Sequence, residues 1–320
     1  MEINNTLEQK EVNKVAVIKH LGYSLASFYR RLKPNSKSNS NKQLSDVDKS
    51  LLVKIKELSL KYPRFGYRKI RAILKREGTI ISESKTYRLM KKGGLLLPKN
   101  KEKKAKRKKD KEKLLKPTKP NEVWQMDITY IWIEKYGWYF LINVIDYFSR
   151  FLLVSIFTDS FCSKNIILAL EEALKKANSI FGAILYKIRL ITDNGISFTS
   201  RRFQKYLNSA GIFNHIRISY RSPELIGLVE RLHLTLKEEE IWPKEYCDPI
   251  EAEKELKKFI EFYNNERPHQ ALNYLTPWEV YSGEYIKDEN GLWVKKEKLN
   301  LTLPNEALTD QIFCCNFFSK

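Results

Sequence analysis

The sequence lacks the cysteine and histidine spacing of a disulfide framework or a zinc site. Its four cysteines are scattered apart from the adjacent pair Cys314 and Cys315, and none of its four histidines accompanies a Cys-x-x-Cys pair. It also lacks an apolar run near the roughly 20 residues needed to cross a bilayer. The polar start MEINNTLEQK does not have the pattern of a signal peptide. We therefore expect a reduced, cytoplasmic protein that binds neither zinc nor a membrane.

Acidic residues are few relative to basic ones. The chain has 58 Lys and Arg against 38 Asp and Glu, which gives a formal net charge of +20. A balance this basic indicates a polyanionic partner, most often nucleic acid, although an ordinary protein with a basic tail has the same signature. Hydrophobic residues make up 42% of the 320, which is enough for a main domain of about 150 residues and a smaller one.

The N-terminal part of the sequence favours helices. Residues 1–33 are expected to form two short helices around a turn, and residues 34–45 have the composition of a linker. Residues 46–97 alternate helix, turn and helix, and the last helix carries Lys85 and Arg88. This pattern suits a helix-turn-helix that enters the DNA major groove, and it suits equally an ordinary helical hairpin with a solvated basic face.

Local signals predict where two of these helices end and begin. Gly78 is expected to end one helix and Ser82 to cap the next. Tyr87 and Met90 are expected to face one small core.

Residues 98–117 are a basic linker by composition. The 18 residues from 99 to 116 contain eleven Lys or Arg and three Asp or Glu. Such a segment cannot bury a core, and it is expected to follow DNA phosphates or to act as a solvated spacer. The residues expected to contact DNA here are Lys106, Arg107, Lys108 and Lys109.

Residues 118–283 have the pattern of an α/β domain. Three strand-like runs joined by short turns come first, and helices and strands then alternate. This order predicts a mixed sheet with helices on its faces. The expected strands are 123–133, 138–146, 151–158, 186–192 and 213–219, and the expected later helices are near 200–210, 224–240 and 250–266.

Three acidic residues in this domain have informative neighbours. Asp127 lies within the apolar run VWQMDITYIWI, Asp193 ends the run YKIRLITD, and Glu230 begins the helical stretch ERLHLTLKEEE. A carboxylate amid apolar sequence is unfavourable without a partner, which favours a metal site over a surface aspartate at Asp127. Two metal ions about 4 Å apart, held by such carboxylates, can activate an oxygen nucleophile and neutralise the leaving oxygen of a phosphodiester.

The helix that begins near Glu230 carries two further candidates. His233 and Lys237 follow Glu230 by three and seven residues and share its face. Lys237 is thereby placed to contact a substrate phosphate, and His233 is included with it as a DNA-binding candidate. If the metal site is wrong, Lys237 is better interpreted as a solvated lysine.

Several segments together resemble the DDE transposases of bacterial insertion sequences. They are WQMDITYI, IDYFSR, TDNGISF, SPELIGLVERLHLTLKEE and NNERPHQALNYLTPWEVY, with FGYRKIRAILKREG and YRLMKKGGL before them. The chain is most similar to the integrase-like catalytic proteins made from the second reading frame of two-frame elements, over roughly residues 62–281. The resemblance implies a ribonuclease H-like core, a mixed five-stranded sheet with flanking helices, preceded by a small all-α helix-turn-helix region.

The resemblance also implies a mechanism and partners. Asp127, Asp193 and Glu230 would be the catalytic, metal-binding triad for two Mg²⁺ ions, with Mn²⁺ as an alternative. They would cleave DNA at the ends of the element and transfer the freed 3′ hydroxyl to target DNA. The implied partners are the terminal repeats and target DNA, a homo-oligomer on DNA, and the product of an upstream reading frame, in the bacterial cytoplasm at the nucleoid.

The chain departs from the family pattern in three places. Between Asp193 and Glu230 there are 36 residues, where the family usually has 35. Ile226 stands where the family commonly has an asparagine, which predicts either weaker DNA contacts or a decaying copy. Residues 284–320 extend past the usual end and are assigned no role.

Two other kinds of protein remain open from the sequence. One is a catalytically inactive transposase remnant or regulator that binds DNA, and the other is a metal-dependent nuclease that cuts without joining. A metal role for other acids is disfavoured. Asp146 begins the turn Asp-Tyr-Phe-Ser-Arg and is expected to cap it.

Overall fold

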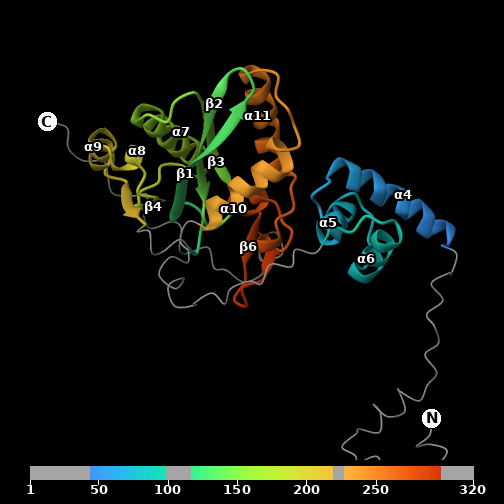
Figure 1. Cartoon of the computed structure of the whole chain (residues 1–320). Helices are drawn as coiled ribbons and strands as arrows, with labels where there is room; N and C mark the ends of the chain where they lie inside the picture. Colours follow the sequence, from blue (N-terminus) through green and yellow to red (C-terminus); the bar gives the residue numbers. More distant parts are fainter. Residues whose placement is uncertain (1–43, 99–116, 219–226, 297–320) are drawn as a thin grey trace, which may run out of the picture. The chain divides into compact units, whose positions relative to one another are not determined.

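A computed structural model describes residues 44–98, 117–218 and 227–296 (Figure 1). By its contacts the chain divides into two units, Met1–Lys54 and Ile55–Lys320. The expected helices within residues 1–33 and the four basic residues of the linker lie outside the described residues, as does Ile226.

The N-terminal described region is helical, as predicted. Its helices are α4 (Asp46–Lys61), α5 (Tyr67–Arg76) and α6 (Glu83–Lys92). Ser82 caps α6 by accepting a hydrogen bond from the backbone N–H of Lys85 at 3.2 Å, which confirms the predicted cap. Gly78 follows α5 with a φ of +80°, a conformation that favours glycine. The prediction for Tyr87 is wrong in part, because Met90 is buried whereas Tyr87 is 38% exposed.

The catalytic-domain prediction of a mixed five-stranded sheet is confirmed. The strand order is β3-β2-β1-β4-β5, with β1, β2 and β3 antiparallel and with β4 parallel to both β1 and β5. The strands are β1 (Val123–Ile133), β2 (Gly137–Asp146), β3 (Leu152–Thr158), β4 (Ile188–Thr192) and β5 (Phe213–Arg217).

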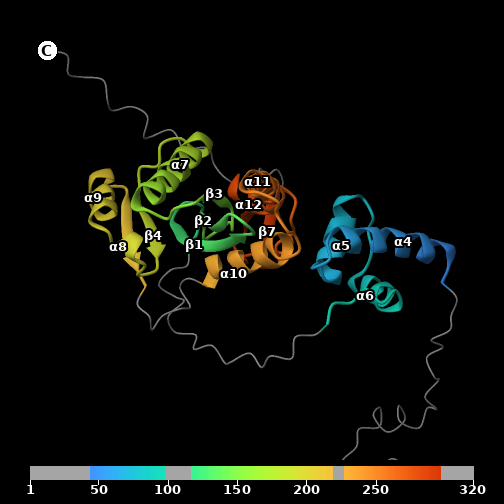
Figure 2. The same ribbon diagram turned by 45° about the horizontal axis from the view of Figure 1, so that its top comes forward.

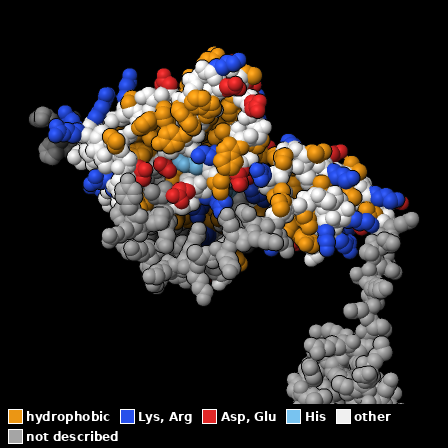
Figure 3. Space-filling model, in the orientation of Figure 1, with side chains coloured by type: hydrophobic (Ala, Val, Ile, Leu, Met, Phe, Trp, Pro, Cys, Tyr) orange, Lys and Arg blue, Asp and Glu red, His pale blue; other side chains and the backbone are white. Residues whose placement is uncertain are grey.

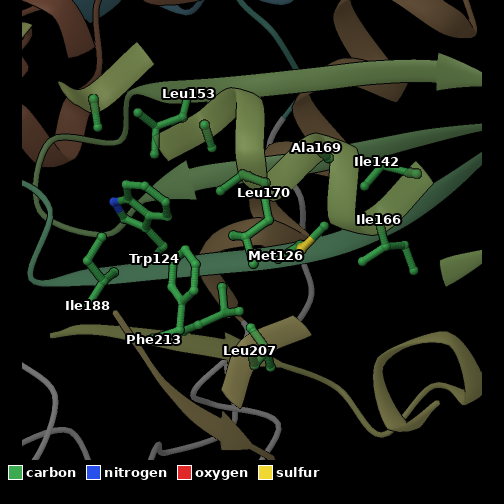
Figure 4. Packing of buried hydrophobic residues seen from close by; sticks show 14 of the residues in the cluster. Trp124, Met126, Ile142, Leu153, Ile166, Ala169, Leu170, Ile188, Leu207 and Phe213 are labelled. Atoms are coloured by element: carbon green, nitrogen blue, oxygen red, sulfur yellow. The ribbon is translucent and has the colours of Figure 1, made fainter. Parts of the chain in front are cut away.

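Alternating side chains of β1 serve two separate cores, because successive residues of a strand point to opposite faces. Trp124 and Met126 pack against one set of helices (Figure 4). Ile131 and Ile133 pack against another set on the opposite face of the sheet (Figure 2). The first face is covered by α7 (Ser163–Phe181), α8 (Ile196–Thr199) and α9 (Arg201–Ala210), and the second by α10 (Gly227–Leu236) and α11 (Pro249–Asn265).

The segment after α11 packs against the rest of its domain. Arg267 donates two hydrogen bonds to the carboxylate of Glu239, from Nε at 2.7 Å and from a terminal nitrogen at 2.6 Å. The buried Tyr281 donates to the side-chain oxygen of Asn121 at 2.9 Å. The elements after α11 are the short helices η4 (Gln270–Leu272) and α12 (Pro277–Tyr281) and the strands β6 (Tyr285–Lys287) and β7 (Trp293–Lys295). Glu239 belongs to the π-helical turn η3 (Lys237–Ile241), which follows α10.

The described part of the extension past residue 283 therefore forms a two-stranded hairpin, β6 with β7. Of the cysteines, Cys162 and Cys247 are exposed and free of disulfides. Within the described ranges, no helix combines the length and the apolar composition needed to cross a bilayer.

Candidate active site

The register of two parallel strands brings Asp127 and Asp193 to the same level. Gln125 of β1 pairs with Ile191 of β4, and this is the last pair between the two strands. Asp127 and Asp193 each follow two residues later, so both lie where β4 ends. Ligand sites in sheets with parallel strands lie at this carboxyl end.

A hydrogen bond between α10 and a side chain of β1 places Glu230 at the same end of the sheet. The backbone N–H of Val229, in the first turn of α10, donates to Oε1 of Gln125 at 3.0 Å. First-turn N–H groups have no partner within the helix, so Gln125 both satisfies one of them and fixes the start of α10 beside β1. Glu230 is the next residue along that helix.

Asp127 shows the electrostatic consequence of this arrangement. Burial raises the pKa of its carboxyl to about 7, and the charges of Asp193 and Glu230 add to the rise. A hydrogen bond of 2.8 Å from the backbone N–H of Ile128 and the charge of Lys237 act in the opposite direction. Asp193 and Glu230 are thus close enough to disfavour the charged form of Asp127, an effect that a bound cation would reverse.

The described side chains do not form a complete metal-binding site. Within residues 44–98, 117–218 and 227–296, no group of three or more His, Cys, Asp or Glu side chains is placed to hold a metal ion. Oδ1 of Asp193 instead accepts from the backbone N–H of Gly195 at 2.8 Å. The donor set nevertheless fits Mg²⁺, which prefers a few carboxylate oxygens completed by water and phosphate. Metal binding by Asp127, Asp193 and Glu230 stays a prediction.

His233 points into the domain and contacts Asp127. Its Nε2 lies 3.1 Å from the amide nitrogen of Asn143, and its Nδ1 lies 3.6 Å from Oδ2 of Asp127. The amide orientation of Asn143 follows from its oxygen, which accepts from Ser155 Oγ at 2.7 Å. Because the amide nitrogen donates to Nε2, the ring proton belongs on Nδ1 and faces Asp127.

The imidazole of His233 is neutral in this environment. Burial, with the charge of Lys237 as a second cause, lowers its pKa to about 3. A neutral ring that donates from Nδ1 can orient the Asp127 carboxylate without adding a positive charge. A direct DNA contact by His233 stays a prediction, and the geometry gives it this positioning contact instead.

The other predicted DNA contacts lie at different places. Lys237 is half-buried at the start of η3, and its charge reaches both Asp127 and His233. Lys85 is half-buried and Arg88 is exposed on α6. On one face of the molecule, acidic side chains gather beside a histidine and basic side chains (Figure 3).

Two residues of the site were not predicted from the sequence. Gln125 shares a strand face with Asp127, which was a usable signal, but its bond to α10 depends on a distant helix. Asn143 is a fully buried amide within the apolar run FLINVI of β2, and a buried polar side chain in such a run indicates a hydrogen-bonded role.

Comparison with known families identifies this domain. Two models described as integrase core domain match residues 117–222 and 213–277, and a model described as HTH-like domain matches residues 46–103. The chain belongs to the integrase core family. Its helical N-terminal region is of the HTH-like type, and its resemblance to insertion-sequence transposases is confirmed.

Curated relatives of this integrase core protein come from insertion elements. It is 28% identical over 271 residues to the putative transposase InsK for insertion sequence element IS150 of Escherichia coli, covering 82% of this chain and 90% of that one. It is 29% identical to an IS407 protein of Burkholderia multivorans, covering 72% and 79%. It is 31% identical to the transposase for IS904 of Lactococcus lactis, covering 51% and 62%.

A solved structure similar to it is the HTLV-2 integrase catalytic core domain in complex with magnesium. The identity is 24% and the TM-score 0.40, covering 52% of this chain and 99% of that one.

Asp146 has a structural place in this integrase core. It is fully buried, and its carboxylate accepts from the backbone N–H of Asn121 and of Ser149, each at 2.8 Å. The Ser149 hydroxyl also donates to it at 2.6 Å. Burial raises the pKa of Asp146 to about 6 even with these bonds. The predicted role as a turn cap is confirmed.

Proposed function

We propose that this integrase core protein is the transposase of a bacterial insertion sequence. It cuts DNA at the ends of its element and joins the freed 3′ hydroxyl to target DNA. The observation that carries the proposal is the approach of Asp193 and Glu230 to Asp127, on whose carboxyl their charges act at the end of β4. The insertion-element relatives and the net charge of +20 support it.

The chemistry needs an activated oxygen nucleophile and a neutralised leaving oxygen. Two divalent ions, Mg²⁺ or Mn²⁺, would supply both when bound by Asp127, Asp193 and Glu230. The chain's own residues do the positioning. The Nδ1 of neutral His233 faces the Asp127 carboxylate at 3.6 Å, Gln125 holds the start of α10, and Lys237 is placed to attract a phosphate beside the acids.

The partners follow from the same proposal. The HTH-like region, with Lys85 and Arg88, would bind the terminal repeats, and the basic linker would contact phosphates. Cutting and joining two ends requires two active sites, so a homo-oligomer on DNA is proposed, with the product of an upstream reading frame as a further partner. The proposed location is the bacterial cytoplasm at the nucleoid.

Replacement of one carboxylate tests the function. Asp127→Asn should lower Mg²⁺-dependent nicking of an element-end duplex by at least about 10²-fold, because an amide cannot replace an anionic metal ligand. DNA binding, measured by gel shift, should be unchanged. Asp159→Asn is the control, because Asp159 is an exposed acid of the same domain. Equal nicking by the wild type and Asp127→Asn would remove Asp127 from the mechanism.

A strand-transfer assay separates the remaining alternatives. Joined products with target DNA support a transposase, whereas cutting without joining indicates a nuclease. Absence of any metal-dependent cleavage by the wild type would indicate an inactive remnant that still binds DNA.

A further inference from the structure

An aromatic pocket includes Lys237, the lysine whose charge acts on Asp127. It has a volume of about 730 Å³ and is formed by the β1–β2 hairpin, Phe161 and η3 with the residue that follows it. A pocket of this size is in the range of sites for small organic ligands. Six of its nine lining residues are aromatic: Tyr130, Trp132, Trp138, Phe140, Phe161 and Trp242.

The rings of this aromatic pocket are exposed yet held in place. Trp132, Trp138 and Trp242 are 56%, 58% and 62% exposed. Trp132 and Trp138 are cross-strand partners whose ring centroids lie 5.1 Å apart at an angle of 66°. Tyr130 contacts Trp138 and Phe140 edge to face. Large apolar surface left open in a group marks a binding site for another molecule.

The charge of the pocket indicates what kind of molecule. Among the described residues that line it, Lys237 is the only charged one, and none is acidic. The same lysine acts on Asp127, so the pocket and the carboxylates share one cation. Tyr130 follows Asp127 by three residues on β1, roughly 10 Å along the strand and on its opposite face, so Lys237 is the residue that connects the pocket with the carboxylates. Flat aromatic walls with a cation at the catalytic side complement a nucleotide, which has a flat base and an anionic phosphate.

We propose that the aromatic pocket binds unstacked bases of a DNA strand whose backbone passes Lys237 at the catalytic centre. The inference rests on the proposed function, because it takes DNA as the substrate. Aromatic rings stack on bases of any sequence, so the pocket holds the strand in position without reading it. The pocket would thus bind the bases of a frayed or single-stranded end, in addition to the phosphate contacts made elsewhere.

The test measures affinity for a single-stranded tail without catalysis. The full chain is titrated in EDTA, by fluorescence anisotropy, with a duplex that ends in a short thymidine tail. The same duplex is used with a blunt end and with a tail of abasic sites. The thymidine tail should improve affinity about tenfold over both, because the abasic tail keeps phosphates but offers no ring to stack.

Paired variants test the rings themselves. The double substitution Trp132→Ala with Trp138→Ala should abolish the tail preference and leave blunt-duplex binding unchanged. The double substitution to phenylalanine at the same positions should keep most of the tail preference, because phenylalanine still offers a ring to stack. This variant therefore separates a loss of stacking from a folding defect. Tyr136→Ala is the matched control, because Tyr136 is an equally exposed aromatic of the same hairpin, 53% exposed, that does not line the pocket.

Two results would overturn the inference. One is an abasic tail that binds as tightly as the thymidine tail. The other is an unchanged tail preference in the double alanine variant, and sedimentation showing that this variant loses a dimer would then assign the pocket to a second copy of the chain. Because the titration needs no cleavage, a tail preference in a protein that does not nick DNA would support the pocket and overturn only the proposed function.

Discussion

At the scale of single residues, the candidate active site is held by side chains that carry no charge. Gln125, Asn143 and neutral His233 connect β1, β2 and α10 around Asp127. A charged residue in these buried positions would need its own partner. Uncharged donors and acceptors fix geometry and leave the negative charge of the acids for a cation.

The raised pKa of Asp127 has a consequence for stability. Its pKa rises from 3.8 to about 7 on folding, so the folded protein binds more protons than the unfolded chain between these values. Stability from this group is therefore full below about pH 4, falls as pH rises, and is lost above about pH 7.

Asp127→Asn should therefore stabilise the metal-free protein at pH 8, by up to roughly 4 kcal/mol, and leave its stability near pH 4 almost unchanged. Urea unfolding in EDTA at the two pH values measures the difference. Asp159→Asn provides the comparison for a solvent-exposed acid. A variant no more stable than the wild type at pH 8 would mean that Asp127 is not held in a desolvated, acidic environment.

At the scale of elements, the local sequence pattern predicted the strands well, but it did not predict how distant elements are placed relative to one another. The alternation VWQMDITYIWI gives β1 its observed ends, and the helix expected near 250–266 is α11 within one residue at each end. The helix expected near 224–240 begins, in its described part, at Gly227 and changes at Lys237 into a π-helical turn. The sequence pattern continues through that point, so it contains no signal for the change.

The candidate site was predictable in its residues but not in its geometry. The apolar surroundings of Asp127 and its place on a strand pointed to it, and family motifs pointed to Asp193 and Glu230. Asp127 and Asp193 lie at the same height in the sheet because of the register in which β1 pairs with β4. Some 60 residues of chain separate these two strands, so local sequence does not set the register. The orientation of the His233 side chain toward the interior depends on its contact with Asn143 of β2.

Gln125 gives a test at the element scale. Gln125→Met keeps the side-chain length but removes the acceptor of the Val229 N–H at the start of α10. The variant should lose about 1–3 kcal/mol of unfolding free energy, because a buried donor is left unpaired, and nicking should fall further than this loss explains.

Urea unfolding and nicking rates measure the two effects of Gln125→Met. Gln204→Met is the control, because Gln204 is a part-buried glutamine on α9 that donates to the backbone of Phe198. Stability should fall in the control as well, without the additional loss of nicking. Equal nicking losses in the two variants would show that the bond to α10 has no role in positioning Glu230.

At the scale of the whole molecule, positive charge is unevenly placed along the chain. Eleven of the 58 basic residues lie within the 18 residues from 99 to 116, between the HTH-like and integrase core regions. Charge of this density attracts DNA phosphates in any sequence. On the proposed function, the carboxylate site would supply the chemistry and the basic stretch would supply affinity for DNA.

Lys-to-Gln changes across residues 101–113 should make DNA affinity less sensitive to salt. For duplex DNA, the slope of log affinity against log salt becomes shallower by about 0.9 for every phosphate that the protein no longer neutralises. Affinity titrations at several salt concentrations measure the slope. Substitution of an equal number of exposed lysines outside this segment, among them Lys257 and Lys258 of α11, is the control for net charge. A slope that does not change would make the segment a spacer.

The unequal lengths of β1 and β4 have a further consequence. β1 has eleven residues and β4 has five, and after Gln125 no described strand pairs with the free side of β1. If DNA is the substrate, as proposed, it would reach Asp127 on this side of β1, where the early end of β4 leaves the strand without a neighbour. A β4 two residues longer would then pair with β1 next to Asp127 and obstruct that approach, so the shortness of β4 would be a requirement for access.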